Sequence, residues 1–158
     1  PFGDMVSNRW EKARLLGFGQ GTSIYDSALI LGNVTVGSHT WIGPNVLLDG
    51  AEAPLSIGDY CSLSAGVQIY THHTVKWAIT GGRDAYEYAP VTVGSCVYFG
   101  PNAIVTKGVS IGNHVIVGAQ SLVNKSLPDF AVAWGQPAKI VGWIKMAEDS
   151  QSFDIEYV

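Results

Sequence analysis

The chain has 158 residues, a formal net charge of −4, only 14% charged residues and 19 glycines. This length favours one domain, and the mild negative charge argues against a surface that binds nucleic acids or other polyanions. No apolar run approaches the roughly 20 residues that span a bilayer, and residues 1–19 lack the apolar region of a signal peptide, so we expect neither a membrane span nor a signal peptide in this sequence. The two cysteines are too few for a disulfide framework, so we expect a cytoplasmic protein with reduced thiols.

The first segment, residues 1–20, carries the pattern of a short amphipathic helix. Residues 5–17 place apolar side chains at helical spacing among charged ones, and Gly17 is a typical stop signal. Elongated repeat domains need a cap over the open end of their core. We therefore predict that this helix caps the domain that follows.

A six-residue repeat begins at Ile24. Apolar residues recur at Ile24, Ile30, Val36, Ile42 and Leu48, and after extra residues within 49–56 the spacing resumes at Ile57, Leu63 and Ile69. Neither a β-strand, with a period of 2, nor an α-helix, with a period of 3.6, produces this spacing. Hexapeptide repeats are typical of a parallel β-helix, in which short strands and turns alternate around each coil.

The repeat then breaks for a long loop over residues 70–90, YTHHTVKWAITGGRDAYEYAP. This loop contains two of the four histidines, together with several aromatic and charged residues. Insertions in repeat folds leave as loops on one face, frequently the binding face. A long excursion with this chemistry therefore predicts a functional element rather than a simple connection.

The repeat is most regular in residues 91–125. Its apolar positions are Val93, Phe99, Val105, Ile111, Val117 and Val123, with a small or branched residue four positions after most of them. Glycine follows the apolar residue in most of these hexads, where we expect tight corners with positive φ. The pattern predicts an all-β protein, a parallel β-helix of about five coils over residues 21–128, with the short N-terminal helix and one long loop excursion.

After residue 128 the sequence leaves the repeat. Pro128 and Pro137 interrupt regular coiling. Residues 129–158 are therefore expected to form an exit segment and a tail. The tail is either a helix or strand along the β-helix or an arm that contacts a partner.

Three stretches of the chain resemble the hexapeptide-repeat acyltransferases of the left-handed β-helix superfamily, in particular the maltose, galactoside and O-antigen O-acetyltransferases and the related xenobiotic acetyltransferases. They are SAGVQIYTHHT (64–74), APVTVGSCVYFGPNAIVTKGVSIG (89–112) and SLVNKSLPDFAVAWGQPAKIVG (121–142). The resemblance implies left-handed coiling and a homotrimer. It also implies transfer of an acetyl or acyl group from acetyl-CoA to a hydroxyl of a saccharide or cell-surface polysaccharide precursor, with no metal.

The resemblance further implies that a loop histidine is the general base. A sugar hydroxyl is a weak nucleophile at neutral pH and needs a base that titrates near that pH, as histidine does. His72 directly follows a coil strand and is the preferred base, whereas His73, which we expect to begin the flexible part of the loop, is the alternative. Glu87 is the candidate that orients the base, with Asp84 as its alternative.

The same resemblance indicates a site for coenzyme A between two subunits. Lys125 and Lys139 match the basic residues that lie near the CoA phosphates in the family. The other cofactor-binding candidates are Tyr98, Gly100, Gly118, Ser121 and Asn124.

Other functions remain open at this point. One is an N-acyltransferase that acts on a nucleotide-linked amino sugar. Another is a zinc protein like the γ-carbonic anhydrases, whose three zinc-binding histidines have a spacing that the adjacent His72 and His73 do not match. The last is a non-catalytic trimeric scaffold. His39 and His114 fall beside turns, where we expect them to have surface or interface roles.

Overall fold

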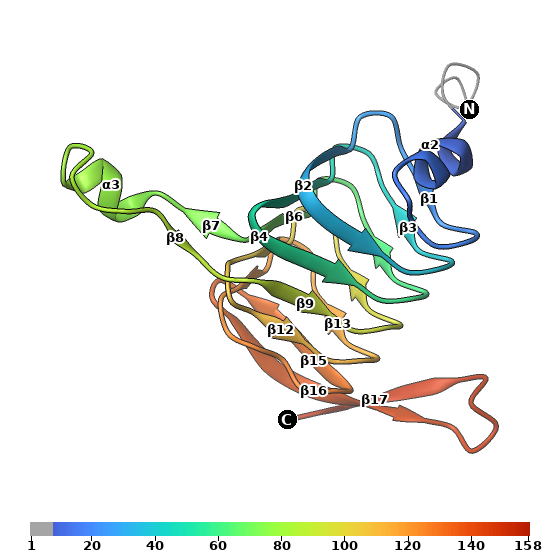
Figure 1. Cartoon of the computed structure of the whole chain (residues 1–158). Helices are drawn as coiled ribbons and strands as arrows, with labels where there is room; N and C mark the ends of the chain where they lie inside the picture. Colours follow the sequence, from blue (N-terminus) through green and yellow to red (C-terminus); the bar gives the residue numbers. More distant parts are fainter. Residues whose placement is uncertain (1–7) are drawn as a thin grey trace.

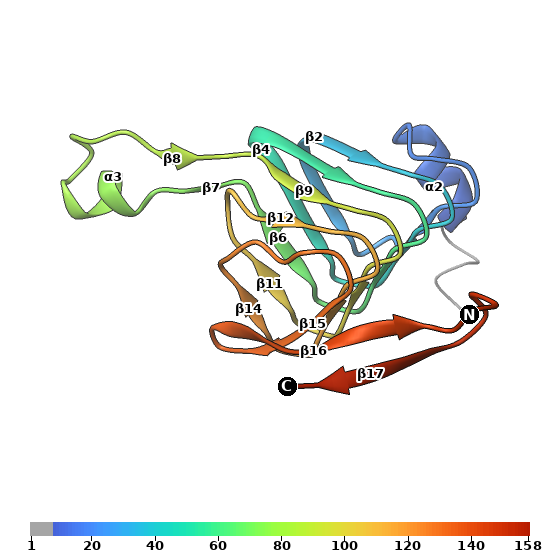
Figure 2. The same ribbon diagram turned by 90° about the horizontal axis from the view of Figure 1, so that it is seen from below.

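The computed structural model describes residues 8–158, which form a parallel β-helix with three flat faces (Figures 1 and 2). Strands of successive coils pair in parallel and in register, as Tyr98 does with Ile116. This arrangement confirms the all-β fold predicted from the six-residue repeat. None of the helices in residues 8–158 has the length and apolar character that crossing a membrane requires.

Each face is a ladder of short parallel strands. Face one contains β1 (Ser23–Ile24), β3 (Trp41–Ile42), β5 (Ser62–Leu63), β10 (Tyr98–Phe99), β13 (Ile116–Val117) and β15 (Ala131–Gly135). Faces two and three share the longer strands β2 (Leu29–Val36) and β4 (Leu47–Ile57), which continue from one face to the next. Face two adds β6 (Gln68–Tyr70), β11 (Ile104–Val105) and β14 (Leu122–Val123), and face three adds β9 (Val91–Val93) and β12 (Ser110–Ile111).

The corner that joins face two to face three is called the site edge below. It consists of residues 49–54, 71–90, 106–109 and 124–127, which follow the face-two strands in successive coils. Both interruptions of the repeat leave the β-helix at this edge. The extra residues within 49–56 account for the register shift between β2 and β4, and the long loop follows β6.

The core consists of the apolar residues at the six-residue spacing. Leu48, Leu63, Ile69, Phe99 and Val105 are completely buried. The small residues four positions later in the hexads are buried as well, among them Val97, Ala103 and Val115. Each buried Val or Leu side chain contributes roughly 1.5–3 kcal/mol. Since the inner surface of a coil is covered only by the adjacent coils, this contribution depends on stacking.

The corner glycines have a different role from the predicted one. Gly94 and Gly58 do not have positive φ; instead, a Cβ on either would lie 2.7 Å from the carbonyl oxygen of the glycine in the next coil. Glycine is required there because the corners of adjacent coils approach so closely. Positive φ angles occur instead at neighbouring non-glycine corner residues such as His39 (55°) and Cys96 (60°), and at glycines of other corners such as Gly108 (75°).

The two outward histidines stack on aromatic side chains of the next coil. His39 lies parallel to Tyr60, with 4.9 Å between the ring centroids, and His114 lies parallel to Phe130 at 5.1 Å. Both therefore contribute to packing along the corner that joins face three to face one.

The N-terminal helix α2 (Arg9–Leu15) packs beside the first coil. The Asn8 side chain caps its first turn by accepting the N–H groups of Trp10 and Glu11. At the other end, Gly17 takes a φ of 76° and the Phe18 N–H donates to the Ala13 carbonyl, as in a Schellman motif. Gly17 thus acts as the stop predicted for it. The predicted start at residue 5 lies outside the described residues.

Helix α2 is also tied to the first coil by Lys12. Its ammonium group donates to the carbonyl oxygens of Tyr25 (2.8 Å), Asp26 (2.9 Å) and Ala28 (3.3 Å). Burial lowers the pKa of Lys12 below its ordinary value. Ala13 joins the hydrophobic core from the same helix.

At the C-terminal end the parallel stack runs past residue 128, where the sequence led us to expect its end. Strand β15 still pairs in parallel with β13. The chain then reverses into β16 (Ala138–Met146) and β17 (Phe153–Tyr157), which add antiparallel strands to face one. Of the alternatives for the tail, the structure therefore has a strand. The hairpin of β16 and β17 extends beyond the β-helix on the side away from the long loop (Figure 2).

Candidate active site

The long loop leaves the site edge from a rigid base. Thr71 is completely buried, and its hydroxyl donates to the Asp49 carbonyl oxygen at 2.9 Å. Its own carbonyl accepts the Ala89 N–H at 2.9 Å, which joins the two ends of the loop. Beyond this base, β7 (His72–His73) pairs antiparallel with β8 (Glu87–Tyr88), and the loop projects away from the β-helix (Figure 1).

The loop is more regular than the sequence indicated. Both histidines belong to β7, so His73 does not begin an irregular segment, and it pairs directly with Glu87. The short helix α3 (Val75–Ile79) follows, and its residue Trp77 packs edge-to-face on Tyr86 at 5.9 Å between centroids. The backbone therefore supports both histidines.

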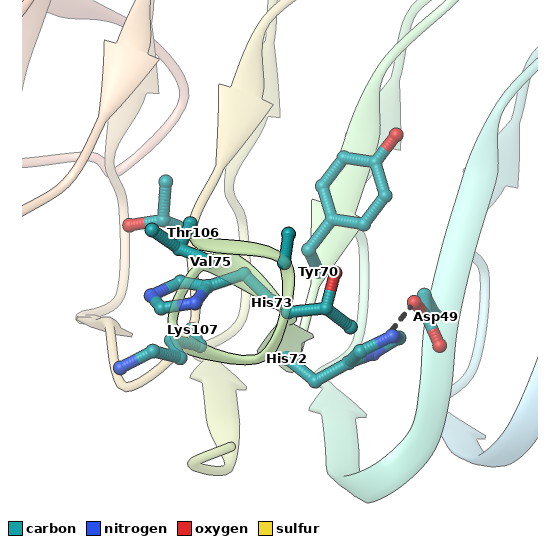
Figure 3. Close-up of a pocket in the computed structure, with 9 residues that line it drawn as sticks. Asp49, Tyr70, His72, His73, Val75, Thr106 and Lys107 are labelled. Carbon is teal, nitrogen blue, oxygen red and sulfur yellow. Dashed lines mark ion pairs between the residues drawn. The ribbon is translucent and has the colours of Figure 1, made fainter. Parts of the chain in front are cut away.

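A hollow of about 520 Å³ lies between the loop and the site edge (Figure 3). Its lining residues are Asp49, Tyr70, His72, His73, Thr74, Val75, Ala78, Thr106 and Lys107. They come from three successive coils and from the loop. The size is adequate for part of a small substrate, since ligand pockets typically measure about 300–1,000 Å³.

His72 points toward Asp49 (Figure 3). Its Nδ1 atom lies 3.1 Å from Asp49 Oδ2, where the Asp49 side chain is 4% exposed and that of His72 is 26% exposed. The two side chains form an ion pair when the imidazole is protonated, but their alignment is not that of a hydrogen bond. Asp49 was not among the residues that the sequence analysis selected.

A signal for Asp49 was nevertheless present in the sequence. It begins the interruption after Leu48, and the long loop interrupts the repeat after Ile69. These two apolar residues occupy equivalent positions, and the structure pairs them in adjacent coils. Counting hexads would therefore have placed both interruptions at one corner.

His73 lies on the other side of β7, toward Thr106 and Lys107 (Figure 3). Its Nδ1 atom is 3.7 Å from Glu87 Oε2, and the other Glu87 oxygen is 3.4 Å from the Lys76 ammonium. The structure thus brings Glu87 to His73 rather than to His72. Asp84 does not line the hollow; its side chain accepts the N–H of Ala85.

A second hollow, of about 360 Å³, lies farther along the site edge. It is lined by Asn124, Lys125, Ser126, Leu127, Pro137, Ala138, Lys139 and Ile140. Val105 pairs with Val123, so Thr106 and Lys107 of the first hollow precede Asn124 and Lys125 by one coil. Adjacent strands are about 4.8 Å apart, which makes the two hollows neighbours. A hollow lined by two lysines is suited to bind an anion.

The remaining cofactor candidates are more dispersed. Gly118 lines a third hollow of about 500 Å³ with Trp134 and Gln136, and the buried Ser121 hydroxyl accepts the Gly135 N–H beside it. Gly100 packs closely against Ala119 of the next coil.

Tyr98 lies apart from the lysines. Its side chain is 43% exposed on face one, in an apolar hollow of about 470 Å³ that Met146 and Phe153 also line. On a single chain it does not share a hollow with Lys125 or Lys139.

Both cysteines are free thiols. Burial raises the pKa of the Cys61 thiol, which lies in the core, whereas Cys96 is exposed at a corner. Among residues 8–158, no three His, Cys, Asp or Glu side chains gather into a group that could hold a metal ion.

Comparisons with known proteins agree with this architecture. Residues 83–125 match the family described as bacterial transferase hexapeptide (six repeats). Galactoside O-acetyltransferase of Escherichia coli is 29% identical over 110 residues, which are 69% of this chain and 53% of that protein. The chain therefore spans about half the length of this relative.

Solved structures give the same result for the fold. A hexapeptide-repeat-containing acetyltransferase from Vibrio cholerae superposes with a TM-score of 0.70 at 26% identity, covering 85% of this chain and 80% of the other. The Vibrio protein has also been solved with acetyl coenzyme A. AntD, an N-acyltransferase from Bacillus cereus solved with dTDP and 3-hydroxybutyryl-CoA, gives 0.69 at 24% identity, covering 85% and 89%, a likeness of fold alone.

These matches confirm the resemblance seen in the sequence. The chain is similar to the hexapeptide-repeat acyltransferases in its repeat segment, and it has their left-handed parallel β-helix fold.

Proposed function

We propose that the protein transfers an acetyl or acyl group from its coenzyme A thioester to a hydroxyl of a saccharide or cell-surface polysaccharide precursor. The observation that carries this proposal is the arrangement of the site edge. A histidine-lined hollow and a lysine-lined hollow lie one coil apart on the same corner. Coenzyme A carries its phosphates and its thioester at different ends of the molecule. In this proposal the lysine-lined hollow binds the phosphates and the histidine-lined hollow receives the thioester.

The proposed reaction begins with the acceptor hydroxyl in the larger hollow. His72 removes the hydroxyl proton through Nε2, and the oxygen attacks the thioester carbonyl carbon. The tetrahedral intermediate then collapses as the carbon–sulfur bond breaks. The departing sulfur takes the proton from Nε2, so that an ester and the free thiol of coenzyme A are formed.

Lys125 and Lys139 are proposed to bind the phosphates of the donor. Both lysines line one hollow, and Asn124 adds a polar residue to it. Gly118 and Ser121 are proposed to border the path of the pantetheine arm, because glycine lets a ligand approach the backbone closely. The Vibrio cholerae structure with acetyl coenzyme A supports this donor class.

A homotrimer is part of the proposal. Several apolar side chains of the loop are exposed on the single chain, notably Ile79 (83%), Val75 (58%) and Trp77 (45%). Exposed apolar patches of this kind commonly mark interaction sites. A neighbouring copy that covers the loop would also bring a second wall to the donor groove, where Tyr98 is proposed to contribute.

An acceptor panel tests the activity. Purified protein is incubated with acetyl-CoA and, separately, with methyl glycosides, a β-galactoside and a dTDP-linked amino sugar, while release of the coenzyme A thiol is recorded. Turnover with a glycoside supports O-acylation. Turnover only with the amino sugar would show that the protein is an N-acyltransferase and not an O-acyltransferase. The proposal is overturned if no thiol is released and neither CoA nor acetyl-CoA raises the melting temperature, since a ligand that binds only the folded state must raise it.

A further inference from the structure

We infer that Asp49 is a positioning residue, which holds the imidazole of His72 in the tautomer and orientation that a general base requires. The inference deepens the proposed function and rests on it, because it concerns the same histidine. Asp49 is a buried carboxylate of β4, which lies one coil before β6, the strand that leads into the long loop.

Asp49 is a buried carboxylate. A carboxylate is costly to bury unless it is paired or hydrogen-bonded. The Asp49 side chain is only 4% exposed, and His72 is the sole ion-pair partner found for it among residues 8–158. Corner residues at equivalent positions, such as Thr106 and Asn124, are uncharged. The buried charge therefore has a specific partner and is not a general feature of the repeat.

Asp49 is itself held in place by hydrogen bonds. Its Oδ1 atom accepts the Ala51 N–H at 3.0 Å. Its backbone carbonyl accepts the Thr71 hydroxyl at 2.9 Å, one residue before His72. Because Asp49 also pairs with Tyr70 across the strands, both residues are fixed to the same part of the coil. Oδ1 thus accepts a backbone hydrogen bond that holds the carboxylate in place, and Oδ2 contacts His72.

This arrangement determines which ring nitrogen can act. A carboxylate beside Nδ1 favours the tautomer that carries its proton there, which leaves the lone pair on Nε2. The same carboxylate stabilises the imidazolium that forms after proton removal. Nδ1 of His72 has no hydrogen-bond partner among the described residues, and Asp49 Oδ2 is the acidic oxygen that lies beside it. Catalytic hydrogen bonds are frequently poorly aligned before substrate binds, so a 3.1 Å contact is suitable for this role.

The neighbouring pair of His73 and Glu87 lacks these features. Its atoms are 3.7 Å apart, and the two side chains are 40% and 34% exposed. Glu87 also contacts Lys76, which competes for its charge. Solvent and a competing cation weaken such a pair. Of the two histidines, only His72 has a carboxylate that is both buried and supported.

Asp49→Asn is the first test, because it keeps the shape of the side chain and removes the charge. We expect kcat with acetyl-CoA and the best acceptor of the panel to fall by roughly 10- to 1,000-fold, less than or comparable to loss of the base itself. The KM for acetyl-CoA should change less than about twofold, since the donor phosphates bind elsewhere. Glu52→Gln is the matched control: it makes the same chemical change on strand β4, at an exposed residue outside the hollow, and should leave kcat unchanged.

A double-mutant cycle separates positioning from structure. If Asp49 acts through His72, adding Asp49→Asn to His72→Ala should cost nothing further in kcat. A full additional loss in the double variant would overturn the inference. If Asp49→Asn keeps its activity while His72→Ala loses it, the positioning role of Asp49 is rejected and the general-base role of His72 stands. If His72→Ala keeps its activity, the general-base role of His72 is rejected as well.

A measurement on the unaltered protein covers the case in which Asp49→Asn does not fold. The ¹⁵N NMR signals of His72, identified by their absence in His72→Gln, report which ring nitrogen carries the proton. At about pH 9, above the range in which histidine usually titrates, we expect the proton on Nδ1. A neutral ring with its proton on Nε2 would show that Asp49 does not position His72.

Discussion

His72 and His73 are adjacent in sequence but have different surroundings. They lie on opposite sides of the short strand β7, so one contacts the buried Asp49 and the other contacts the partly exposed Glu87. A general base must hold its geometry within a fraction of an ångström, which requires rigid neighbours. The residue-scale structure therefore favours His72, whereas His73 lies toward Thr106 and Lys107.

The first residue-scale prediction concerns the base. His72→Ala should lower kcat by about 10²–10⁴-fold, the range expected for loss of a general base. Acetyl-CoA affinity should be retained. His73→Ala is the matched control and should lose less than about tenfold. Steady-state kinetics and acetyl-CoA titration of both variants measure these effects. A collapse of kcat in His73→Ala with normal turnover in His72→Ala would reverse the assignment.

The second residue-scale prediction concerns the two thiols. Because burial raises the pKa of Cys61, that thiol stays protonated at neutral pH, and the thiolate is the reactive form. Native protein should therefore release about one equivalent of thionitrobenzoate quickly, from the exposed Cys96, and a second only after denaturation. Cys96→Ser is the control that should abolish the fast phase. Fast reaction of both thiols in native protein would contradict the burial of Cys61.

At the scale of the elements, the site edge collects the functional groups. It combines the start of the interruption in β4, the long loop after β6 and the corners after β11 and β14. Parallel stacking places each of these segments one coil from the next. As a result, side chains from distant parts of the chain form two adjoining hollows with different chemistry, one with histidines and one with lysines.

The prediction at this scale separates donor binding from catalysis. Lys125→Ala and Lys139→Ala should each raise the KM for acetyl-CoA and leave kcat and the acceptor KM unchanged, because a phosphate contact that does not involve the reacting thioester contributes equally to the ground and transition states. A lost hydrogen bond to a charged group costs roughly 1.5–3 kcal/mol, or about 10- to 150-fold in KM.

Lys145→Ala is the matched control for these lysines. Lys145 is exposed and pairs with Glu156 on the C-terminal hairpin, outside both hollows. Its substitution should leave the KM for acetyl-CoA unchanged. Dephospho-CoA derivatives serve as alternative donors. An equal KM increase with the dephospho donor would show that the lysine does not bind the 3′-phosphate.

At the scale of the whole molecule, stability depends on the stack of coils. Every coil has its inner face covered only by its neighbours, by α2 at one end and by the last strands at the other. Stacked repeats of this kind are stabilised mainly by contacts with their nearest neighbours. The loop and the hairpin extend from this rigid body on different sides, where they are available for contacts between copies (Figure 2).

The stacking prediction uses two neighbouring positions on one strand. Ile111→Asp buries an unpaired charge in the core and should prevent soluble expression. Ser110→Asp places the same side chain on the outer surface of β12 and should yield folded protein with a similar melting temperature. Expression yield and thermal unfolding measure both. Normal yield and melting of Ile111→Asp would mean that the inward positions are misassigned.

The assembly prediction follows from the proposed trimer. Sedimentation equilibrium at micromolar concentration should give about three times the chain mass of 16.8 kDa. Ile79→Asp, in the exposed part of the loop, should weaken the trimer while leaving the fold of the single chain intact, because a charge is unfavourable in an apolar contact. If the unaltered protein is a monomer, the proposal of a donor groove shared between two copies is rejected.

The sequence by itself determined the repeat, its inward positions and the segments that leave it. These features are periodic and local: a six-residue spacing of apolar residues is typical of a parallel β-helix, and the inward residues Phe99 and Val105 are buried as predicted. The reason for the corner glycines was not local. Gly94 is required by the backbone of the next coil, which a single hexad does not reveal.

Only the tertiary structure decided the details of the candidate site. The side to which each histidine points follows from the pairing of β7 with β8, and this register assigns Glu87 to His73. The contact of Asp49 with His72 depends on two interruptions that stack on the same corner. Such contacts join residues far apart in sequence through the coils between them. No local pattern specifies them, because the direction of a side chain at a corner is set by the neighbouring coil.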